Sequence, residues 1–123
     1  MASPELQGWL EQVIDGTGSQ RIKWKPANPT TYIWEVPPPK NGRVSLQRVE
    51  RVENYAVRPG QIAQRKIVHY VLQVYDLSKP QQPAVAVNGA EDADANTQLE
   101  KLFQQVSSEA YRENLDFLKS LLP

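Results

Sequence analysis

The chain has 123 residues, no cysteine, and equal numbers of acidic and basic residues, so its formal net charge is zero. This length can bury a hydrophobic core without disulfides, which predicts one domain over residues 1–123. Without cysteine there are no disulfides or thiolate metal sites, and no apolar run approaches the roughly 20 residues of a membrane span. The start of the chain also lacks the pattern of a signal peptide. We therefore expect a cytoplasmic protein that does not enter membranes.

The charge is unevenly distributed along the chain. Residues 1–20 carry a formal charge of −3, residues 21–66 carry +7 and residues 67–123 carry −4. The simpler interpretation is a set of strands with basic outer residues and helical ends with acidic ones. The alternative is that the basic middle binds an acidic partner such as nucleic acid.

An amphipathic helix is predicted at the start of the chain. Ser3 is a capping residue and Pro4 suits the first helical position. Gly16 is expected to end the helix, and residues 16–19 to form a turn. Because this glycine-containing turn precedes a strand and not a helix, it lacks the arrangement of a phosphate-binding loop.

Two strands are predicted next. Residues 21–25 alternate basic and apolar side chains, as a half-buried strand does. A turn over residues 26–29 then leads to a second strand over residues 31–36. Three consecutive prolines follow, and proline lacks the backbone donor that a sheet needs. We therefore expect a projecting loop over residues 37–42.

The third strand is predicted over residues 43–55, and its apolar pattern changes phase part-way. Arg48 and Glu50 lie where apolar residues are expected. A β-bulge near residues 47–49 would restore the pattern, and a strand bent over the edge of the sheet is the alternative. A polar loop is predicted over residues 56–64.

The rest of the chain predicts two more strands and a helical segment. Residues 66–76 are partly apolar on both faces, which is typical of a central strand, and residues 84–87 form a short fifth strand. Helical spacing runs through residues 97–122, with Ser107 and Ser108 interrupting it. This pattern predicts either two helices or one kinked helix.

Together these elements predict an α+β fold: an antiparallel β-meander of about five strands, with the N-terminal helix and the C-terminal helical segment packed on one face. Short links between successive strands exclude parallel neighbours, which need longer crossovers. The predicted core consists of Trp9, Leu10, Trp24, Trp34, Leu46, Tyr70, Leu72, Leu102, Phe103 and Leu118.

No catalytic or metal site is predicted. His69 is the only histidine; it lies within a strand, where we expect a structural or interface role, and no nucleophile is placed beside it. Asp92, Asp94 and Asn96 have the spacing of the first half of a calcium loop. That loop also needs glycine at its sixth position and glutamate at its twelfth, and this sequence has neither. We expect no cofactor.

The best candidate binding surface is the outer face of the sheet. Alternate residues of the second, third and fourth strands would form an apolar patch there, and such patches often mark interfaces. Its predicted members are Ile33, Val49, His69, Val71, Gln73 and Tyr75. Coverage by the loops at residues 37–42 or 56–64 is the alternative.

Three hypotheses for function follow. The first is a non-enzymatic interaction module that binds a protein partner, or itself, through the outer face. The second is binding of nucleic acid by basic strand residues, namely Arg21, Lys23, Lys25, Arg43, Arg48 and Arg51. The third is a small enzyme or ligand-binding domain with a pocket between sheet and helices, lined by Tyr32, Glu35, Tyr55, His69 and Tyr70.

Overall fold

The computed structural model describes residues 4–36, 41–79 and 81–122. Its elements follow one another as α1 (Pro4–Gly18), β1 (Lys25–Asn28), β2 (Thr31–Val36), β3 (Gly42–Arg58), β4 (Gln61–Asp76), β5 (Val85–Asn88) and α2 (Ala93–Ser120). The five strands form one sheet in chain order, and every neighbouring pair is antiparallel. The predicted α+β meander is confirmed.

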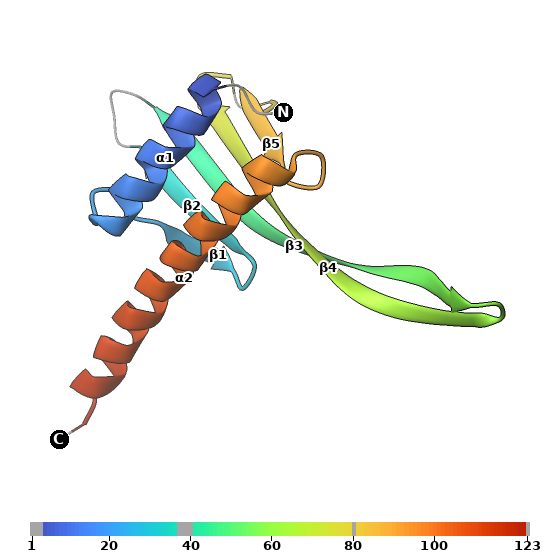
Figure 1. Ribbon diagram of the computed structural model, residues 1–123. Helices are drawn as coiled ribbons and strands as arrows, with labels where there is room; N and C mark the ends of the chain where they lie inside the picture. Colours follow the sequence, from blue (N-terminus) through green and yellow to red (C-terminus); the bar gives the residue numbers. More distant parts are fainter. Residues whose placement is uncertain (1–3, 37–40, 80, 123) are drawn as a thin grey trace.

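Unequal strand lengths give the molecule its shape. β3 and β4 have 17 and 16 residues, whereas β2 has six and β5 has four. The pairing of β2 with β3 ends at Gln47, and the pairing of β5 with β4 ends at Val71. Residues 48–70, which we call the arm, therefore form a two-stranded ribbon that projects from the body (Figure 1). At about 3.3 Å per residue, the arm is roughly 35 Å long.

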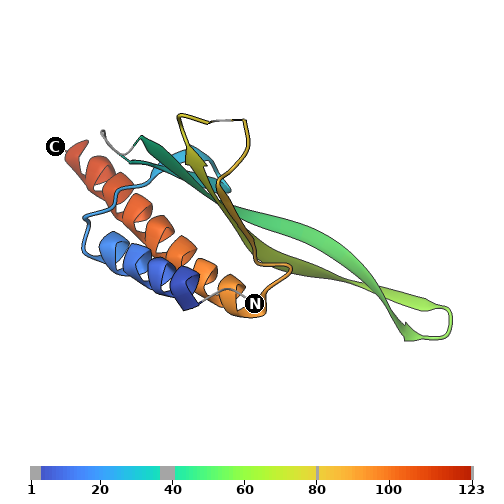
Figure 2. The same ribbon diagram turned by 90° about the horizontal axis from the view of Figure 1, so that it is seen from above.

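Both helices lie on one face of the sheet, side by side (Figure 2). The Gln98 side chain donates a hydrogen bond to the backbone carbonyl of Gln7, which joins the N-terminal parts of the two helices. Between the helices and the sheet lies the core of buried side chains: Leu10, Val13, Val44, Leu46, Tyr70, Leu72, Val87, Ala95, Leu99, Leu102 and Val106.

The predicted core is confirmed in part. Its members Trp9, Trp24, Trp34 and Phe103 are partly buried against the core cluster. Leu118 is wrong, because 58% of its surface is exposed. α2 has 28 residues and α1 has 15, so α2 is nearly twice as long. Its last turns continue past the body, where no other element covers them (Figure 1).

The predicted strand over residues 21–25 is wrong, and so is the turn over 26–29. The backbone N–H groups of Arg21 and Ile22 both donate to the Gly16 carbonyl, at 2.9 and 3.1 Å, so they close the end of α1 and cannot join a ladder. The Trp24 indole donates to the buried Thr17 hydroxyl at 3.1 Å, which holds this segment against α1. Strand pairing begins only with β1, an edge strand that tolerates Pro26.

The predicted bulge at residues 47–49 is also wrong. The register of β3 with β4 is unbroken from Gly42 to Ala56, and its one irregularity lies between Ala56 and Arg58, beside the turn. The apolar pattern fails at Arg48 because the strand leaves the core there. Residues 56–64 are the end of the arm and not a polar loop, and the strands are joined there by a turn at Gly60, with a φ of 81°.

α2 is one continuous helix through Ser107 and Ser108, so the interpretation as two helices is wrong. Its start is capped by Asp92, whose side chain accepts hydrogen bonds from the backbone N–H groups of Asp94 and Ala95. Asp94 adds an acidic side chain to the first turn of α2. The predicted loop at residues 37–42 lies mainly outside the described residues.

Stability should depend on the first half of α2 and not on its end. We expect Leu102→Ala to lower the free energy of unfolding by about 2–5 kcal/mol, because it leaves a cavity in the core. Leu118→Ala should change it by less than about 0.5 kcal/mol, since the side chain is exposed. Urea unfolding of both variants measures these free energies. Equal losses of stability would contradict the conclusion that the core includes Leu102 and excludes Leu118.

Candidate functional site

The six predicted outer-face residues do lie on one face of the sheet, opposite the helices. Leu46 and Leu72 are paired and point into the core, so residues at odd positions beside them point away from it. Val49 is directly opposite His69, and Ser45 pairs with both Ile33 and Gln73. All six side chains are partly buried: Ile33, Val49, His69, Val71, Gln73 and Tyr75. Whether they bind a partner stays a prediction.

One of the two proposed covers does not lie over this face. Residues 56–64, proposed as a cover, lie at the far end of the arm, away from the body (Figure 2). The other proposed cover, at residues 37–42, falls mainly outside the described residues. The buried Nδ1 atom of His69 has no hydrogen-bond partner in the part of the chain that the structure describes. A buried polar atom of this kind is normally satisfied by water or by a bound partner.

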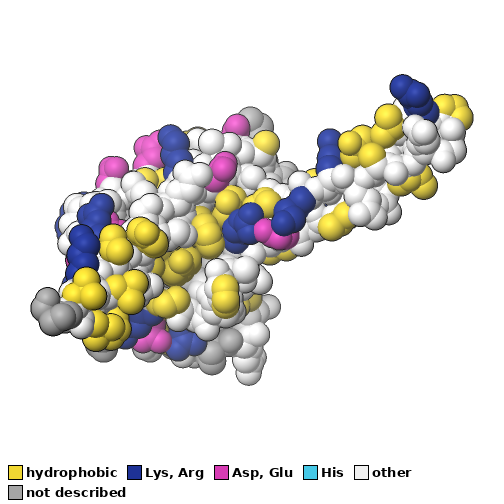
Figure 3. All heavy atoms as spheres, turned by 90° about the horizontal axis from the view of Figure 1, so that it is seen from below, with side chains coloured by type: hydrophobic (Ala, Val, Ile, Leu, Met, Phe, Trp, Pro, Cys, Tyr) yellow, Lys and Arg dark blue, Asp and Glu magenta, His cyan; other side chains and the backbone are white. Residues whose placement is uncertain are grey.

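The arm carries exposed apolar side chains that the sequence analysis did not single out. The exposed fractions are 64% for Val52, 42% for Tyr55, 55% for Val57 and 76% for Ile62. Figure 3 shows hydrophobic side chains along the arm with Lys and Arg between them, and a second group near the C-terminal end. The useful signal was the strand-forming residues Val52, Tyr55, Val57 and Ile62 on the two sides of the Pro59–Gly60 turn, which are compatible with a long hairpin.

The second exposed apolar group belongs to the end of α2. Its large side chains are more than half exposed, and they are Tyr111, Phe117, Leu118, Leu121 and Leu122. This group and the arm are the two apolar surfaces that project from the body. They lie at opposite ends of the molecule (Figure 1).

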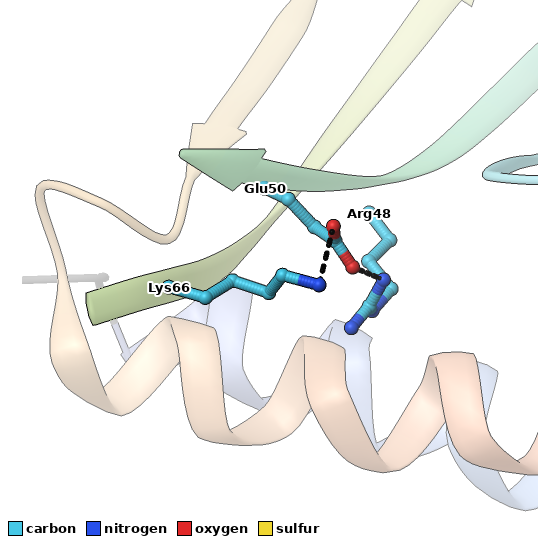
Figure 4. A network of polar contacts seen from close by, with 3 residues as sticks. All are labelled: Arg48, Glu50 and Lys66. Carbon is cyan, nitrogen blue, oxygen red and sulfur yellow. Dashed lines mark hydrogen bonds and ion pairs between the residues drawn. The ribbon is translucent and has the colours of Figure 1, made fainter. Parts of the chain in front are cut away.

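Ion pairs replace hydrophobic packing at the root of the arm. The Arg48 guanidinium donates to the Glu50 carboxylate, and Lys66 Nζ lies 3.3 Å from the other oxygen of that carboxylate (Figure 4). The hydrogen bond from Arg48 has the larger effect and that from Lys66 the next. Together they lower the pKa of Glu50 below its ordinary value. Farther along, Arg65 pairs with Glu53 at 3.2 Å.

The six basic residues proposed for nucleic acid are not brought together. Arg43 pairs with Glu35 at 3.4 Å and Arg48 pairs with Glu50. The other four lie in separate places: Arg21 and Lys23 follow α1, Lys25 begins β1, and Arg51 is on the arm.

The five residues proposed for a pocket are separated too. Tyr32 and Tyr70 both contact the ring of Phe103, with ring centroids 5.3 Å apart, and so belong to the core. Glu35 and His69 are on the outer face, and Tyr55 is on the arm. Two hollows among the described residues, of about 280 and 400 Å³, are lined by none of the five.

Comparisons of the chain with models of protein families, with curated proteins and with solved structures found no match. Among residues 4–36, 41–79 and 81–122, no three acidic or histidine side chains converge as metal ligands. Within the same residues, neither helix is apolar enough over a sufficient length to cross a membrane.

The ion pairs at the root of the arm predict a response to pH. Because the pKa of folded Glu50 is lowered, its contribution to stability is present above the pKa of the unfolded chain and is lost as pH falls through the folded value. We expect the Glu50 carboxyl to titrate by NMR below an unfolded-peptide glutamate, and Lys66→Met to raise its midpoint. Lys101→Met, an exposed change on α2, is the control. An ordinary midpoint in the intact protein would contradict the network.

Proposed function

We propose that this chain is a non-enzymatic protein-interaction module. Its binding surface is the outer face of the sheet together with the arm, and a cytoplasmic location is part of the proposal. The observation that carries it is the arm: a ribbon that leaves the core beyond Tyr70 and exposes four large apolar side chains, at Val52, Tyr55, Val57 and Ile62. Large apolar side chains gathered on a projecting element are typical of interaction sites.

The energetics of the arm support this proposal. Fixing a residue's backbone costs about 1–2 kcal/mol, and an isolated two-stranded hairpin is at best marginally stable in water. Fully burying one valine or isoleucine contributes about 1.5–3 kcal/mol, but Val52 and Ile62 remain mostly exposed. A bound partner would supply the burial that the body does not.

One side of the arm, which carries Tyr55, continues the outer face of the sheet, whereas Val52 and Ile62 lie at even positions on the opposite side of the ribbon. Val49 and His69, at the edge of the body, are followed on the same side by the pairs Arg51–Ile67 and Glu53–Arg65. A partner that covers both sides of the arm would therefore also reach the predicted outer-face residues. It could satisfy the orphaned ring nitrogen of His69.

Nucleic acid is the second candidate, and the charge of the arm favours it. Residues 48–70 contain five Lys or Arg and two Glu, a formal charge of +3, and a two-stranded ribbon fits a DNA groove. Against it, Arg48, Arg65 and Lys66 are already paired with glutamates. Phosphate binding is strongest at low salt, so DNA that fails to bind at about 50 mM salt removes this candidate.

Site-specific photo-crosslinking tests the proposed module. We expect a photoreactive amino acid at position 52 or 62 to give crosslinked protein adducts in cells that express the chain. The same group at position 101, on the exposed side of α2, is the matched control. Adducts from position 101 alone, or none from the arm and from position 71 on the outer face, would contradict the proposal.

A further inference from the structure

The exposed side of α1 is acidic. Glu5, Glu11 and Asp15 are all exposed, and the helix contains no Lys or Arg. At about 100° per residue the three carboxylates fall within an arc of roughly 120°. They form a strip of formal charge −3, equal and opposite to the +3 of the arm.

A hollow of about 400 Å³ lies beside this strip, between α1 and β2. The half-buried indole rings of Trp9 and Trp34 line it, and Asp15 connects it to the acidic strip. Arg21 lies at the same hollow, where its side chain donates to the Ser19 hydroxyl at 2.9 Å. The site thus combines two indole rings with one acidic and one basic side chain, and the acidic strip continues from it through Asp15.

Exposed apolar and unpaired basic side chains along the arm complement that site. Val57 and Ile62 are exposed apolar side chains next to a narrow Pro–Gly turn. Arg51 and Arg58 have no ion-pair partner among the described residues, so both can bind carboxylates elsewhere. Opposite charges on two protein surfaces steer association, and apolar contacts then hold it.

The arm cannot reach the α1 of its own chain. It projects from one end of the body and α1 lies toward the other, as both ribbon views show (Figures 1 and 2). A contact between the arm and α1 must therefore join two molecules. Because it uses a different surface on each of them, it leaves one free arm and one free α1, and further copies can add.

We propose that the partner of the arm is a second copy of this chain, bound head to tail. The arm of one copy lies along the acidic strip of the next, with Val57 and Ile62 against the hollow lined by Trp9 and Trp34. This inference rests on the proposed function of the arm and names its partner. It explains why a charge of +3 on the arm and a charge of −3 on α1 lie apart on a molecule whose net charge is zero.

Two blocked variants of the purified full-length chain test the direction of assembly. Val57→Ser with Ile62→Ser disables the arm, and Glu11→Lys with Asp15→Lys disables the strip; all four positions are exposed, so the fold should be kept, as circular dichroism can verify. In sedimentation velocity, we expect the unmodified chain to form species larger than a dimer that dissociate in high salt. Each variant alone should be monomeric. An equal mixture should form a dimer and nothing larger, because only one arm and one strip remain intact.

Three outcomes would overturn the inference. One is an unmodified chain that is monomeric at every concentration. Another is a strip variant that assembles like the unmodified chain, which would indicate contacts between two arms. The third is loss of assembly in Leu118→Ser with Leu122→Ser, the matched control at the end of α2, while the arm variant still assembles. Arm adducts to a different protein, with a monomeric purified chain, would reject self-assembly and leave the proposed function standing.

Discussion

The junction at which the short strands end determines what this molecule buries and what it exposes. There the Asn96 side chain accepts a hydrogen bond from the Tyr70 backbone N–H at 2.9 Å, and the Gly89 N–H donates to the Tyr70 carbonyl at 2.8 Å. A Cβ at Gly89 would lie only 2.8 Å from that carbonyl oxygen, so the close approach requires glycine. α2 and the end of β5 thus complete the hydrogen bonding of β4 at the last buried position.

From Tyr70 toward the turn at Gly60, the backbone pairing of β3 and β4 continues, but the side chains that hold the two strands together are of a different kind. Inside the body, side chains such as Leu46 and Leu72 are fully buried. On the arm, cross-strand ion pairs and the Arg65 guanidinium over the Tyr55 ring, 5.5 Å from its centroid, take over. Exposed pairs of this kind contribute little, about 0–1 kcal/mol each. The arm is therefore the part of the sheet that burial against a second surface would stabilise most. Its projecting shape makes such burial by a partner possible, in agreement with the proposed interaction.

Much of the fold could be predicted because the signals were local. β2 places Tyr32, Trp34 and Val36 on one face, and α1 has a proline start and one apolar stripe. The predictions that were wrong depended on contacts between residues outside the local pattern, or on side chains that make no contacts. Periodicity at Arg21 to Lys25 could not reveal that the Gly16 carbonyl takes two of their N–H groups. The helical spacing around Leu118 likewise could not show that this side chain lies past the body and is exposed. The outer-face set followed from strand parity alone, whereas the apolar arm was missed because residues 56–64 were interpreted as a loop.

Hydrogen exchange measured at low and high protein concentration tests most directly whether the arm is a binding element that a second surface covers. At low concentration, the account predicts rapid exchange of the arm amides, residues 49–69, and slow exchange in the core positions around Leu46 and Leu72. At high concentration the arm and α1 should gain protection together, while the end of α2 does not change. Arm amides as protected as the core at every concentration would contradict the account, because the ribbon would then be stable without a partner.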